Sequence, residues 1–294
     1  MRRYLEHWRN CRKIRKLLRA HPGHRLGALY WYDLPLAHAI SWRGFLRVVW
    51  WNLRSPQRDE IAANHDFESL YFAPSPKDGT AEPAPTVWRL EGVASRPWWD
   101  EPSSVTRALR MRAPEIAAEF KAVSASIDTH PDQRSLVDRG RWTGMFLYGA
   151  GGQRNEILAA ECPVTTQVVE ALPLCPHFGF VMFSGMEPRT HVAPHSGSTN
   201  LRLRHHLAVD VPEPEKGRIR VGAEWRRWLQ GEVIAFDDSY QHEVVYDGEQ
   251  PRIVLVVDTW HPALGASDIA ILSDPVFQPF GKTRRSSTPE RGRD

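Results

Sequence analysis

The clearest pattern of apolar and polar positions lies in residues 201–211, LRLRHHLAVDV. Apolar and polar side chains largely alternate there, with the period of two that is typical of an extended strand. The apolar positions are Leu201, Leu203, Leu207, Val209 and Val211, and the polar ones are Arg202, Arg204, His206 and Asp210. The pattern predicts a strand with one apolar face and one face that carries two arginines and a histidine.

Further short β-like runs dominate the chain from about residue 139 onward, separated by Gly, Pro, Asn and Asp. They read WTGMFLYG, FGFVMFSG (178–185), RIRVG (218–222), EVIAFDD (232–238), HEVVYD (242–247) and RIVLVVD (252–258). Many short strands at close spacing predict a mainly β fold, either a sandwich or a barrel.

The N-terminal part contains two segments with helical spacing of apolar residues. Residues 1–20 place apolar side chains at helical spacing, with cations on the other faces, and predict a basic amphipathic helix. Residues 103–127 predict a second helix, which Ser103 or Ser104 can cap. Pro114 should break or kink that second helix, because proline lacks the backbone N–H that a helix interior requires.

The region between these helices contains the most apolar stretch of the chain and a loop-like stretch. Polar residues and a proline interrupt the aromatic segment 26–53, so no uninterrupted apolar run is long enough to span a membrane. Residues 55–104 are rich in proline and polar residues, which is typical of loops. No apolar stretch of the signal-peptide kind follows the basic N-terminus. We therefore expect a cytoplasmic location, with peripheral membrane attachment as the alternative.

The net charge of +3 is distributed unevenly. Residues 1–20 carry +7 and residues 281–294 carry +3, so the body of the chain carries −7. An acidic body argues against a nucleic-acid partner. The basic helix at 1–20 could dock on the body with a solvated face, or could contact an anionic membrane or an acidic partner.

The three cysteines, Cys11, Cys162 and Cys175, form no CxxC motif. A sparse and odd number of cysteines argues against a disulfide framework and against a cysteine zinc site. We expect free thiols in a reducing compartment.

Two histidines and an arginine accompany the basic strand. His195 lies just upstream of it, His242 follows the acidic turn FDDSYQ, and Arg252 begins the apolar run RIVLVVD. Non-haem Fe(II) oxygenases bind iron through two histidines, usually with a carboxylate, and leave positions open for O₂ and a co-substrate. If the co-substrate is 2-oxoglutarate, its distal carboxylate needs a cation, and arginine binds carboxylates bidentately. The polar face of 201–211 would then line a carboxylate site inside a double-stranded β-helix.

Longer runs of the sequence resemble the aspartyl/asparaginyl β-hydroxylases, a family of 2-oxoglutarate- and Fe(II)-dependent dioxygenases. The matching runs are GRWTGMFLYGAGGQRNEILAAECPVTTQVVEALP, FSGMEPRTHVAPHSGSTNLRLRHHL, GEVIAFDDSYQHEVVYD and RIVLVVDTWHPAL. The resemblance implies a jelly-roll, cupin-like core of the double-stranded β-helix type over residues 139–265. The remaining parts would be the basic helix at 1–20, an aromatic- and proline-rich region at 21–138 that packs on the core, and a C-terminal extension at 266–294 with a disordered basic tail.

The resemblance implies that His195 and His242 bind the iron. The general dioxygenase pattern has an aspartate two residues after the first histidine, and Gly197 stands there instead, as it does in the family that the chain resembles. Asp238 is expected to orient a water molecule at the metal through a hydrogen bond. Direct coordination by Asp237 or Asp238 is the alternative.

The resemblance also assigns the residues that hold the organic ligands. Ser184 and Arg252 would grip the distal carboxylate of 2-oxoglutarate, and Arg204 with His206 would lie near its metal-chelating end. Arg202 is the candidate for the carboxyl group of the substrate.

The predicted function is hydroxylation of an unactivated carbon with O₂, most simply the β-carbon of an aspartyl- or asparaginyl-like amino acid. The substrate would be a free or carrier-bound amino acid or a peptide natural product. A lipid-linked acyl chain at a membrane surface is one alternative. A non-catalytic β-barrel module that binds an acidic ligand is another, and a zinc hydrolase is disfavoured because a third ligand and a placed general base are missing.

Overall fold

A computed structural model gives the architecture of most of the chain from residue 82 onward. The described residues are 82–85, 88–90, 92–149 and 152–273, together with three short strands, β1 (His24–Leu26), β2 (Tyr30–Trp31) and β3 (Leu34–Pro35). The predicted basic helix at 1–20, most of the aromatic segment 26–53, Cys11 and the tail at 281–294 lie outside them.

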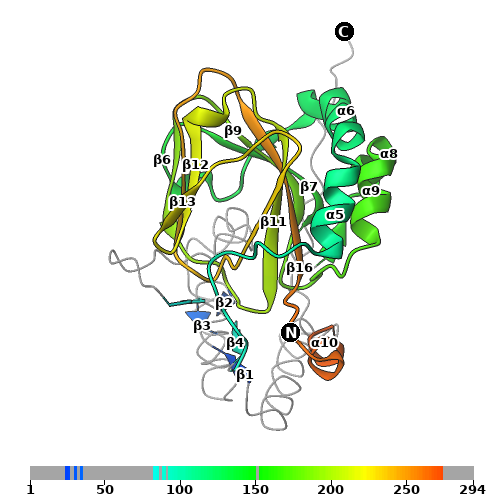
Figure 1. The fold of residues 1–294 in the computed structure, drawn as a ribbon, viewed down its shortest axis with the longest axis vertical. Coiled ribbons are helices and arrows are strands. Elements are labelled where there is room, and N and C mark those ends of the chain that lie inside the picture. The colour runs from blue at the N-terminus through cyan, green and yellow to red at the C-terminus, as the bar shows by residue number, and fades with distance from the viewer. Residues whose placement is uncertain are drawn as a thin grey trace, which may run out of the picture.

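Two antiparallel sheets form the body of the protein, as Figure 1 shows. The larger sheet has the order β14-β11-β16-β9-β7-β5. Its strands are β5 (Asp128–Thr129), β7 (Trp142–Gly149), β9 (Val181–Met186), β11 (Arg202–Asp210), β14 (Val233–Phe236) and β16 (Arg252–Trp260), with β8 (Gln153–Arg154) paired to β7. The smaller sheet consists of β13 (Glu224–Arg226), β12 (Gly217–Val221), β15 (His242–Tyr246), β10 (Thr190–His195) and β6 (Val137–Arg139).

From β9 onward the chain passes back and forth between the two sheets. Strands β9, β11, β14 and β16 belong to the larger sheet, and β10, β12, β13 and β15 belong to the smaller one. The resulting orders, β14-β11-β16-β9 and β13-β12-β15-β10, are those of an eight-stranded jelly roll. The prediction of a mainly β, double-stranded β-helix core is confirmed.

Strand β11 keeps the alternation that its sequence predicts. Leu207 and Val209 join the apolar cluster on the outer side of the larger sheet, whereas Arg204 and His206 line a pocket between the sheets. All residues of β11 except the last are buried. The polar face of this strand therefore points into the protein and not into solvent.

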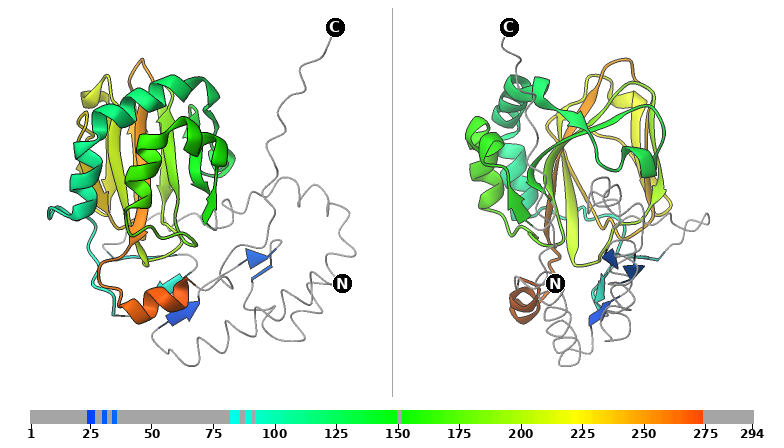
Figure 2. Two further views of the ribbon diagram at one scale, coloured as in Figure 1. Left: turned by 90° about the vertical axis from the view of Figure 1, so that its right-hand side faces the viewer. Right: turned by 180° about the vertical axis from the view of Figure 1, so that it is seen from behind.

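Four helices cover the outer face of the larger sheet (Figure 2, left). They are α5 (Ser104–Met111), α6 (Ala113–Val123), α8 (Glu156–Glu161) and α9 (Pro163–Glu170). Ser103 caps α5 through a reciprocal pair of hydrogen bonds with Thr106, and the helical segment is interrupted at Arg112, just before Pro114. The predicted cap and the predicted break are thus both confirmed. Helices α8 and α9 were not predicted.

Two further α-helices lie in the described part of the chain, α7 (Gln133–Leu136) and α10 (Ala266–Leu272). None of the helices described is long and apolar enough to cross a bilayer. Cys162 and Cys175 are buried free thiols, as expected.

A segment that precedes the helices borders one end of the barrel, and we call its described residues, 82–85, 88–90 and 92–100, the strap. Its strand β4 (Trp88–Leu90) pairs with β1. The Leu90 backbone exchanges two hydrogen bonds of 2.9 Å with the Asn200 side chain, in the loop between β10 and β11. The backbone of Trp98 forms an isolated antiparallel β-bridge with Phe236, the last residue of β14. The strap therefore contacts both connections that flank His195 and His242.

Candidate functional site

A pocket of about 440 Å³ lies between the two sheets. Strands of both sheets contribute to its wall, and most of the contributed side chains are apolar. The polar and aromatic residues that line it are Trp142, Ser184, His195, Arg204, His206, Phe236, His242 and Arg252. Of the eight site residues proposed from sequence, six lie on its wall, and Arg202 and Asp238 do not.

His195 and His242 lie opposite each other on adjacent strands of the smaller sheet. His195 ends β10, His242 begins β15, and the two are direct register partners. Their ring centroids are 4.1 Å apart, and only 3% and 4% of their surfaces are exposed. The structure thus brings together the two residues that the sequence proposed as iron ligands.

A β-bulge turns His195 toward the pocket. Val192 pairs with Val244 and His195 with His242, so β10 has one residue more than β15 between these two pairs. Val192 and His195 would point to opposite faces of a regular strand, yet both line the pocket. The orientation of His195 therefore depends on the bulge.

Backbone carbonyls fix the tautomer of both rings. Nδ1 of His195 lies 2.8 Å from the Ala193 carbonyl oxygen, and Nδ1 of His242 lies 2.9 Å from that of Tyr240. A carbonyl oxygen only accepts, so each Nδ1 carries the proton and each Nε2 keeps its lone pair. Burial lowers the pKa of His242 to about 3 and holds the pKa of His195 well below its usual value. Both rings are neutral, which is the form that binds a metal.

No carboxylate completes a three-residue metal site in the described part of the chain. A Cβ atom at Gly197 would lie 2.5 Å from Oδ2 of Asp238, so the Asp238 carboxylate occupies the space of a side chain at that position. Asp237 accepts hydrogen bonds from the Ser95 hydroxyl at 2.7 Å and from the Ser239 backbone at 2.9 Å. Direct coordination by Asp237 or Asp238 stays a prediction.

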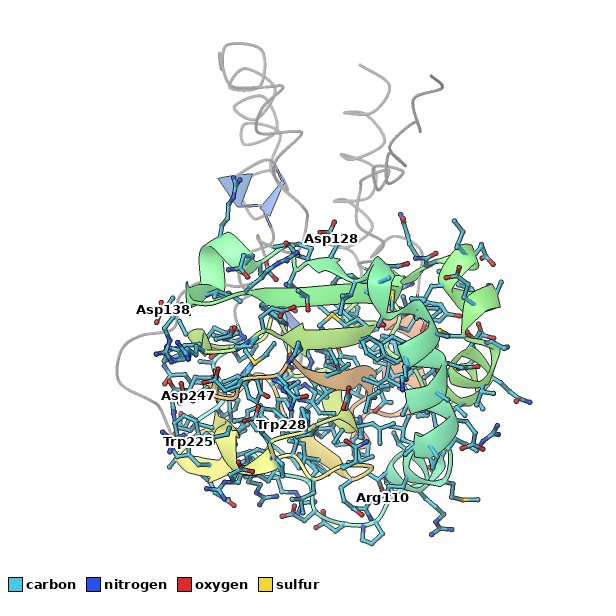
Figure 3. The ribbon with its side chains drawn as sticks, turned by 90° about the horizontal axis from the view of Figure 1, so that it is seen from above. Arg110, Asp128, Asp138, Trp225, Trp228 and Asp247 are labelled. Carbon is cyan, nitrogen blue, oxygen red and sulfur yellow. The ribbon has the colours of Figure 1, made fainter. Side chains whose placement is uncertain are left out.

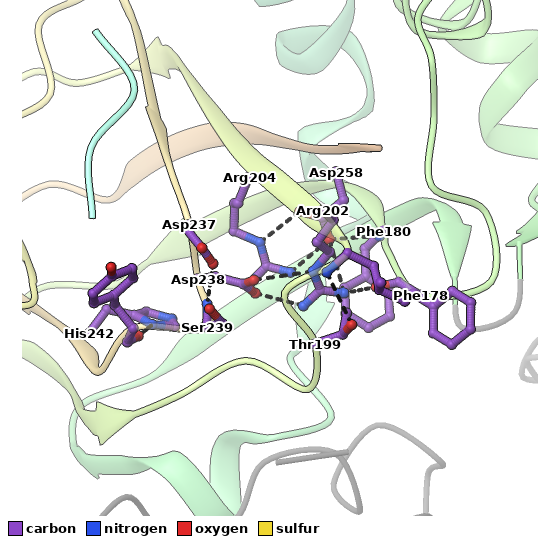
Figure 4. A network of polar contacts seen from close by, with 12 residues as sticks. Phe178, Phe180, Thr199, Arg202, Arg204, Asp237, Asp238, Ser239, His242 and Asp258 are labelled. Atoms are coloured by element: carbon purple, nitrogen blue, oxygen red, sulfur yellow. Dashed lines mark hydrogen bonds and ion pairs between the residues drawn. The ribbon is translucent and has the colours of Figure 1, made fainter. Parts of the chain in front are cut away.

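Asp238 belongs to a buried cluster of two arginines and two aspartates (Figure 4). Arg202 Nη2 lies 2.6 Å from Asp238 Oδ2, and Arg204 binds Asp258 bidentately with two contacts of 2.8 Å. Arg204 Nη1 is also 3.3 Å from Asp238 Oδ2. Burial disfavours ionisation of Asp238, but the two arginines outweigh that effect and lower its pKa. The four charges balance within the cluster.

The two arginines of this cluster have different surroundings. Arg204 lines the pocket, whereas Arg202 does not and is only 1% exposed. Arg202 also donates a hydrogen bond to the Phe178 backbone carbonyl. Its donors are therefore engaged inside the protein, and its role toward the carboxyl group of a substrate stays a prediction. Sequence reasoning missed Asp258, because this residue lies within the largely apolar strand β16.

Arg252 is a buried cation without a counterion in the described part of the chain. Its side chain lines the pocket, 2% of its surface is exposed, and Nε and Nη1 have no hydrogen-bond partner among the described residues. Its guanidinium carbon lies 4.1 Å from the centroid of the Trp228 ring. Burial lowers the pKa of Arg252 to about 9, which still leaves it protonated at neutral pH. An unpaired buried cation indicates a site for an anion.

Ser184 faces the same cavity as Arg252. It pairs with Val254 on the neighbouring strand, two residues from Arg252, so both side chains project from the same face of the sheet. The Ser184 hydroxyl oxygen accepts a hydrogen bond of 2.9 Å from the Trp142 indole. Its own proton remains available for a ligand in the pocket.

The indole of Trp228 donates a hydrogen bond to His206. Trp228 Nε1 lies 3.3 Å from Nδ1 of His206. Burial keeps the pKa of His206 well below its usual value, so the ring is neutral. Sequence reasoning gave no role to Trp142 or Trp228, because no pattern distinguishes them from the other tryptophans of the chain.

These residues fit a divalent transition metal and a dicarboxylate. Two neutral imidazoles with lone pairs on Nε2 are suitable ligands for Fe(II), and their number leaves positions open for other ligands. Arg252 and Ser184 offer donors to one carboxylate, and Arg204 and His206 offer donors elsewhere on the wall of the same pocket.

Comparison with known proteins places this arrangement in a family. The family model described as Aspartyl/Asparaginyl beta-hydroxylase matches residues 110–262. The human protein named aspartyl/asparaginyl beta-hydroxylase is 34% identical over 187 residues, which are 61% of this chain and 24% of that protein. The chain thus spans about a quarter of the length of its human relative.

A bacterial relative matches over more of its own length. The ornithine lipid ester-linked acyl 2-hydroxylase of Rhizobium tropici is 31% identical over 194 residues, which are 65% of this chain and 68% of that protein. Among solved structures, a Trichoplax adhaerens prolyl hydroxylase in complex with a peptide fragment aligns with a TM-score of 0.39 at 9% identity. That alignment covers 55% of this chain and 82% of the other.

Proposed function

The chain belongs to the aspartyl/asparaginyl beta-hydroxylase family, and on that premise we propose that it is a hydroxylase that uses Fe(II), 2-oxoglutarate and O₂. One observation carries the proposal. A single pocket contains two adjacent neutral imidazoles, His195 and His242, and one buried guanidinium, Arg252, that has no counterion among the residues that the structure describes. The two imidazoles are suitable ligands for a metal ion. The guanidinium is suitable for binding the far carboxylate of a dicarboxylic acid that chelates this metal.

The residues of this chain would divide the work as follows. His195 and His242 would hold the iron through Nε2, because their Nδ1 atoms are hydrogen-bonded to backbone carbonyls. When bound, iron with O₂ and 2-oxoglutarate supplies the oxidation of an unactivated C–H bond, coupled to decarboxylation of 2-oxoglutarate to succinate. Arg252 and Ser184 would hold the distal carboxylate, and Arg204 and His206 would orient the other end.

The charge distribution of the pocket supports binding of a dianion. The charges of Arg202 and Arg204 are balanced by Asp238 and Asp258, and the histidines are neutral. Arg252 therefore contributes net positive charge to the pocket, to which a divalent metal would add. 2-Oxoglutarate carries two negative charges, one at each end, and would compensate both centres.

The surrounding residues would exclude water from this pocket. The loop residues 196–200 and 237–241 are all buried. The strap contacts both of these loops through Asn200 and Ser239. A dry pocket strengthens each charge-assisted hydrogen bond to the ligand.

Two substrate classes remain for the proposed hydroxylase. The name of the family points to the β-carbon of an aspartyl- or asparaginyl-like residue, here in a free or carrier-bound amino acid or a peptide natural product. The Rhizobium relative, of which the chain covers 68%, is named for an acyl chain linked to ornithine lipid. That coverage favours a lipid-linked acyl chain as the second candidate. A non-catalytic binding module would retain the ligand pocket without turnover.

An anaerobic titration of the purified protein with Fe(II) and 2-oxoglutarate tests the proposal. We expect the visible charge-transfer band of the iron–2-oxoglutarate chelate in the wild type and its loss in His242→Ala. His191→Ala is the matched control, because His191 lies on the same strand as His195 but bonds Glu243 and Asp138 outside the pocket. The control should keep the band.

The outcomes separate the candidate functions. A band in the wild type and in His191→Ala, but not in His242→Ala, would establish the two-histidine site. Succinate release in the presence of amino-acid or lipid-linked acceptors would then identify the substrate class. A band without succinate release on any acceptor would favour the binding module. No band in a folded wild-type protein would refute the proposal.

A further inference from the structure

Trp228 connects two residues that lie on different strands of the pocket wall. It follows β13 and is only 1% exposed, whereas Trp225 of the same segment is 38% exposed. Figure 3 shows Trp228 inside the outline of the molecule and Trp225 near its edge. The indole of Trp228 contacts His206 of β11 through Nε1 and Arg252 of β16 through its ring face. Trp228 does not itself line the pocket.

The hydrogen bond to His206 determines which ring nitrogen carries the proton. An indole N–H can only donate, so Nδ1 of His206 must accept and is unprotonated. The ring is buried and neutral, and its single proton therefore resides on Nε2. His206 lines the pocket, so Nε2–H is the donor that it can offer to a ligand there. In the opposite tautomer Nε2 would be an acceptor and would repel a carboxylate.

The ring of Trp228 also supports the guanidinium of Arg252. The guanidinium carbon lies 4.1 Å from the ring centroid, which is a cation–π distance. Nε and Nη1 have no hydrogen-bond partner among the described residues, so no described polar group fixes these atoms. The aromatic face is thus the contact that orients Arg252 before a ligand arrives.

We infer that Trp228 is a positioning residue of the proposed 2-oxoglutarate pocket, which sets the tautomer of His206 and the orientation of Arg252 together. One buried indole would then prepare a donor for each end of the dicarboxylate. The identity of the ligand rests on the proposed function. The tautomer of His206 does not, and it can be measured on the metal-free protein.

The first test is NMR spectroscopy of the protein with ¹⁵N-labelled histidine. In the wild type we expect a pyridine-like Nδ1 and a pyrrole-like Nε2 for His206, whose signals are assigned by their loss in His206→Gln. Trp228→Phe keeps a buried ring but removes the N–H, and we expect a mixed or inverted tautomer. An unchanged His206 spectrum in Trp228→Phe would overturn the inference.

Trp98→Phe is the matched control for this experiment. Trp98 is also buried, at 6% exposure, and also has an arginine over its ring, with the Arg226 guanidinium 4.3 Å from the centroid. Its Nε1 has no hydrogen-bond partner among the described residues. Loss of that N–H should therefore leave the spectrum of His206 unchanged, whereas a general effect of tryptophan loss would alter it in both variants.

The second test measures ligand affinity from the charge-transfer band. We use 2-oxoglutarate and 2-oxobutyrate, which lacks the distal carboxylate. Trp228→Phe should weaken both ligands by about fivefold, because a neutral hydrogen bond contributes about 1 kcal/mol and His206 serves the shared chelating end. Trp228→Leu also removes the ring beneath Arg252, so its loss should be larger for 2-oxoglutarate than for 2-oxobutyrate.

The results distinguish failure of the inference from failure of the proposed function. If the folded Trp228 variants bind 2-oxoglutarate and 2-oxobutyrate as tightly as the wild type does, the positioning role is overturned, even if the tautomer of His206 shifts. If the wild type shows no band, the proposed function fails, while the NMR result still decides whether Trp228 sets the tautomer. If Trp228→Leu does not fold, the milder Trp228→Phe decides the outcome alone.

Discussion

Replacement of Arg252 by methionine should stabilise the protein and abolish tight binding of 2-oxoglutarate. Burial lowers the pKa of Arg252 to about 9, roughly a 3,000-fold change in its proton equilibrium relative to a solvated guanidinium. That factor corresponds to about 5 kcal/mol by which the folded state disfavours the charge. Methionine fills a similar volume without charge but loses the cation–π contact with Trp228, which is worth about 1–2 kcal/mol.

We therefore expect Arg252→Met to raise the free energy of unfolding at pH 7 by about 3–4 kcal/mol, net of these two effects. The sign of the pH dependence follows from the lowered pKa. The charge destabilises the folded state of the wild type fully below pH 9, and this penalty declines as the pH rises through 9. The difference between variant and wild type should accordingly narrow above pH 9.

Urea unfolding of the ligand-free protein, with unchanged m-values, measures the stability change. Titration of the Fe(II) chelate measures affinity for 2-oxoglutarate, which should fall by about 10- to 150-fold, since a charge-assisted bond contributes about 1.5–3 kcal/mol. Arg220→Met is the control. Arg220 pairs with Glu243 outside the pocket, so its loss should lower stability slightly and leave affinity unchanged. A less stable Arg252→Met variant that retains affinity would refute the reasoning.

Two further predictions concern the other charged groups near the histidines. Gly197→Asp should not improve iron binding or turnover, because its side chain would displace Asp238 and break the pair with Arg202. A several-fold gain in succinate release would contradict the two-histidine site. Asp258→Asn should destabilise the protein to urea by about 3–5 kcal/mol, since it leaves the buried Arg204 guanidinium poorly compensated. The control is Asp247→Asn, which removes the exposed ion pair between Arg139 and Asp247. It should change the free energy of unfolding by less than about 1 kcal/mol.

The strands that form the body of the barrel were predictable because their patterns are local. The alternation in 201–211 predicted both faces of β11, including the inward direction of Arg204 and His206. The cap at Ser103 and the break before Pro114 followed from the chemistry of single residues. Such features depend on neighbours within a few positions in the sequence.

The strand that carries His195 was not predicted, and the reason is physical. Residues 190–195 read THVAPH, and Val192 and His195 would face opposite sides of a regular strand. A bulge brings both to the pocket, and a bulge is defined only by pairing with β15, some 50 residues away in sequence. The motif identified His195, but only the partner strand explains where its ring points.

The arginines show most clearly where sequence reasoning stops. Arg202, Arg204 and Arg252 all occupy buried positions on central strands, and sequence alone assigned each of them to a carboxylate. In the structure, Asp238 and Asp258 neutralise the first two. Asp258 is the partner of Arg204 on the neighbouring strand β16, and Asp238 comes from the loop between β14 and β15, so both contacts depend on segments distant in sequence. Arg252 lies against the Trp228 ring and has no counterion among the described residues. All three residues are arginines, so residue type does not distinguish them. Arg252 is the strongest candidate for binding the dicarboxylate because, unlike Arg202 and Arg204, it has no carboxylate partner among the described residues.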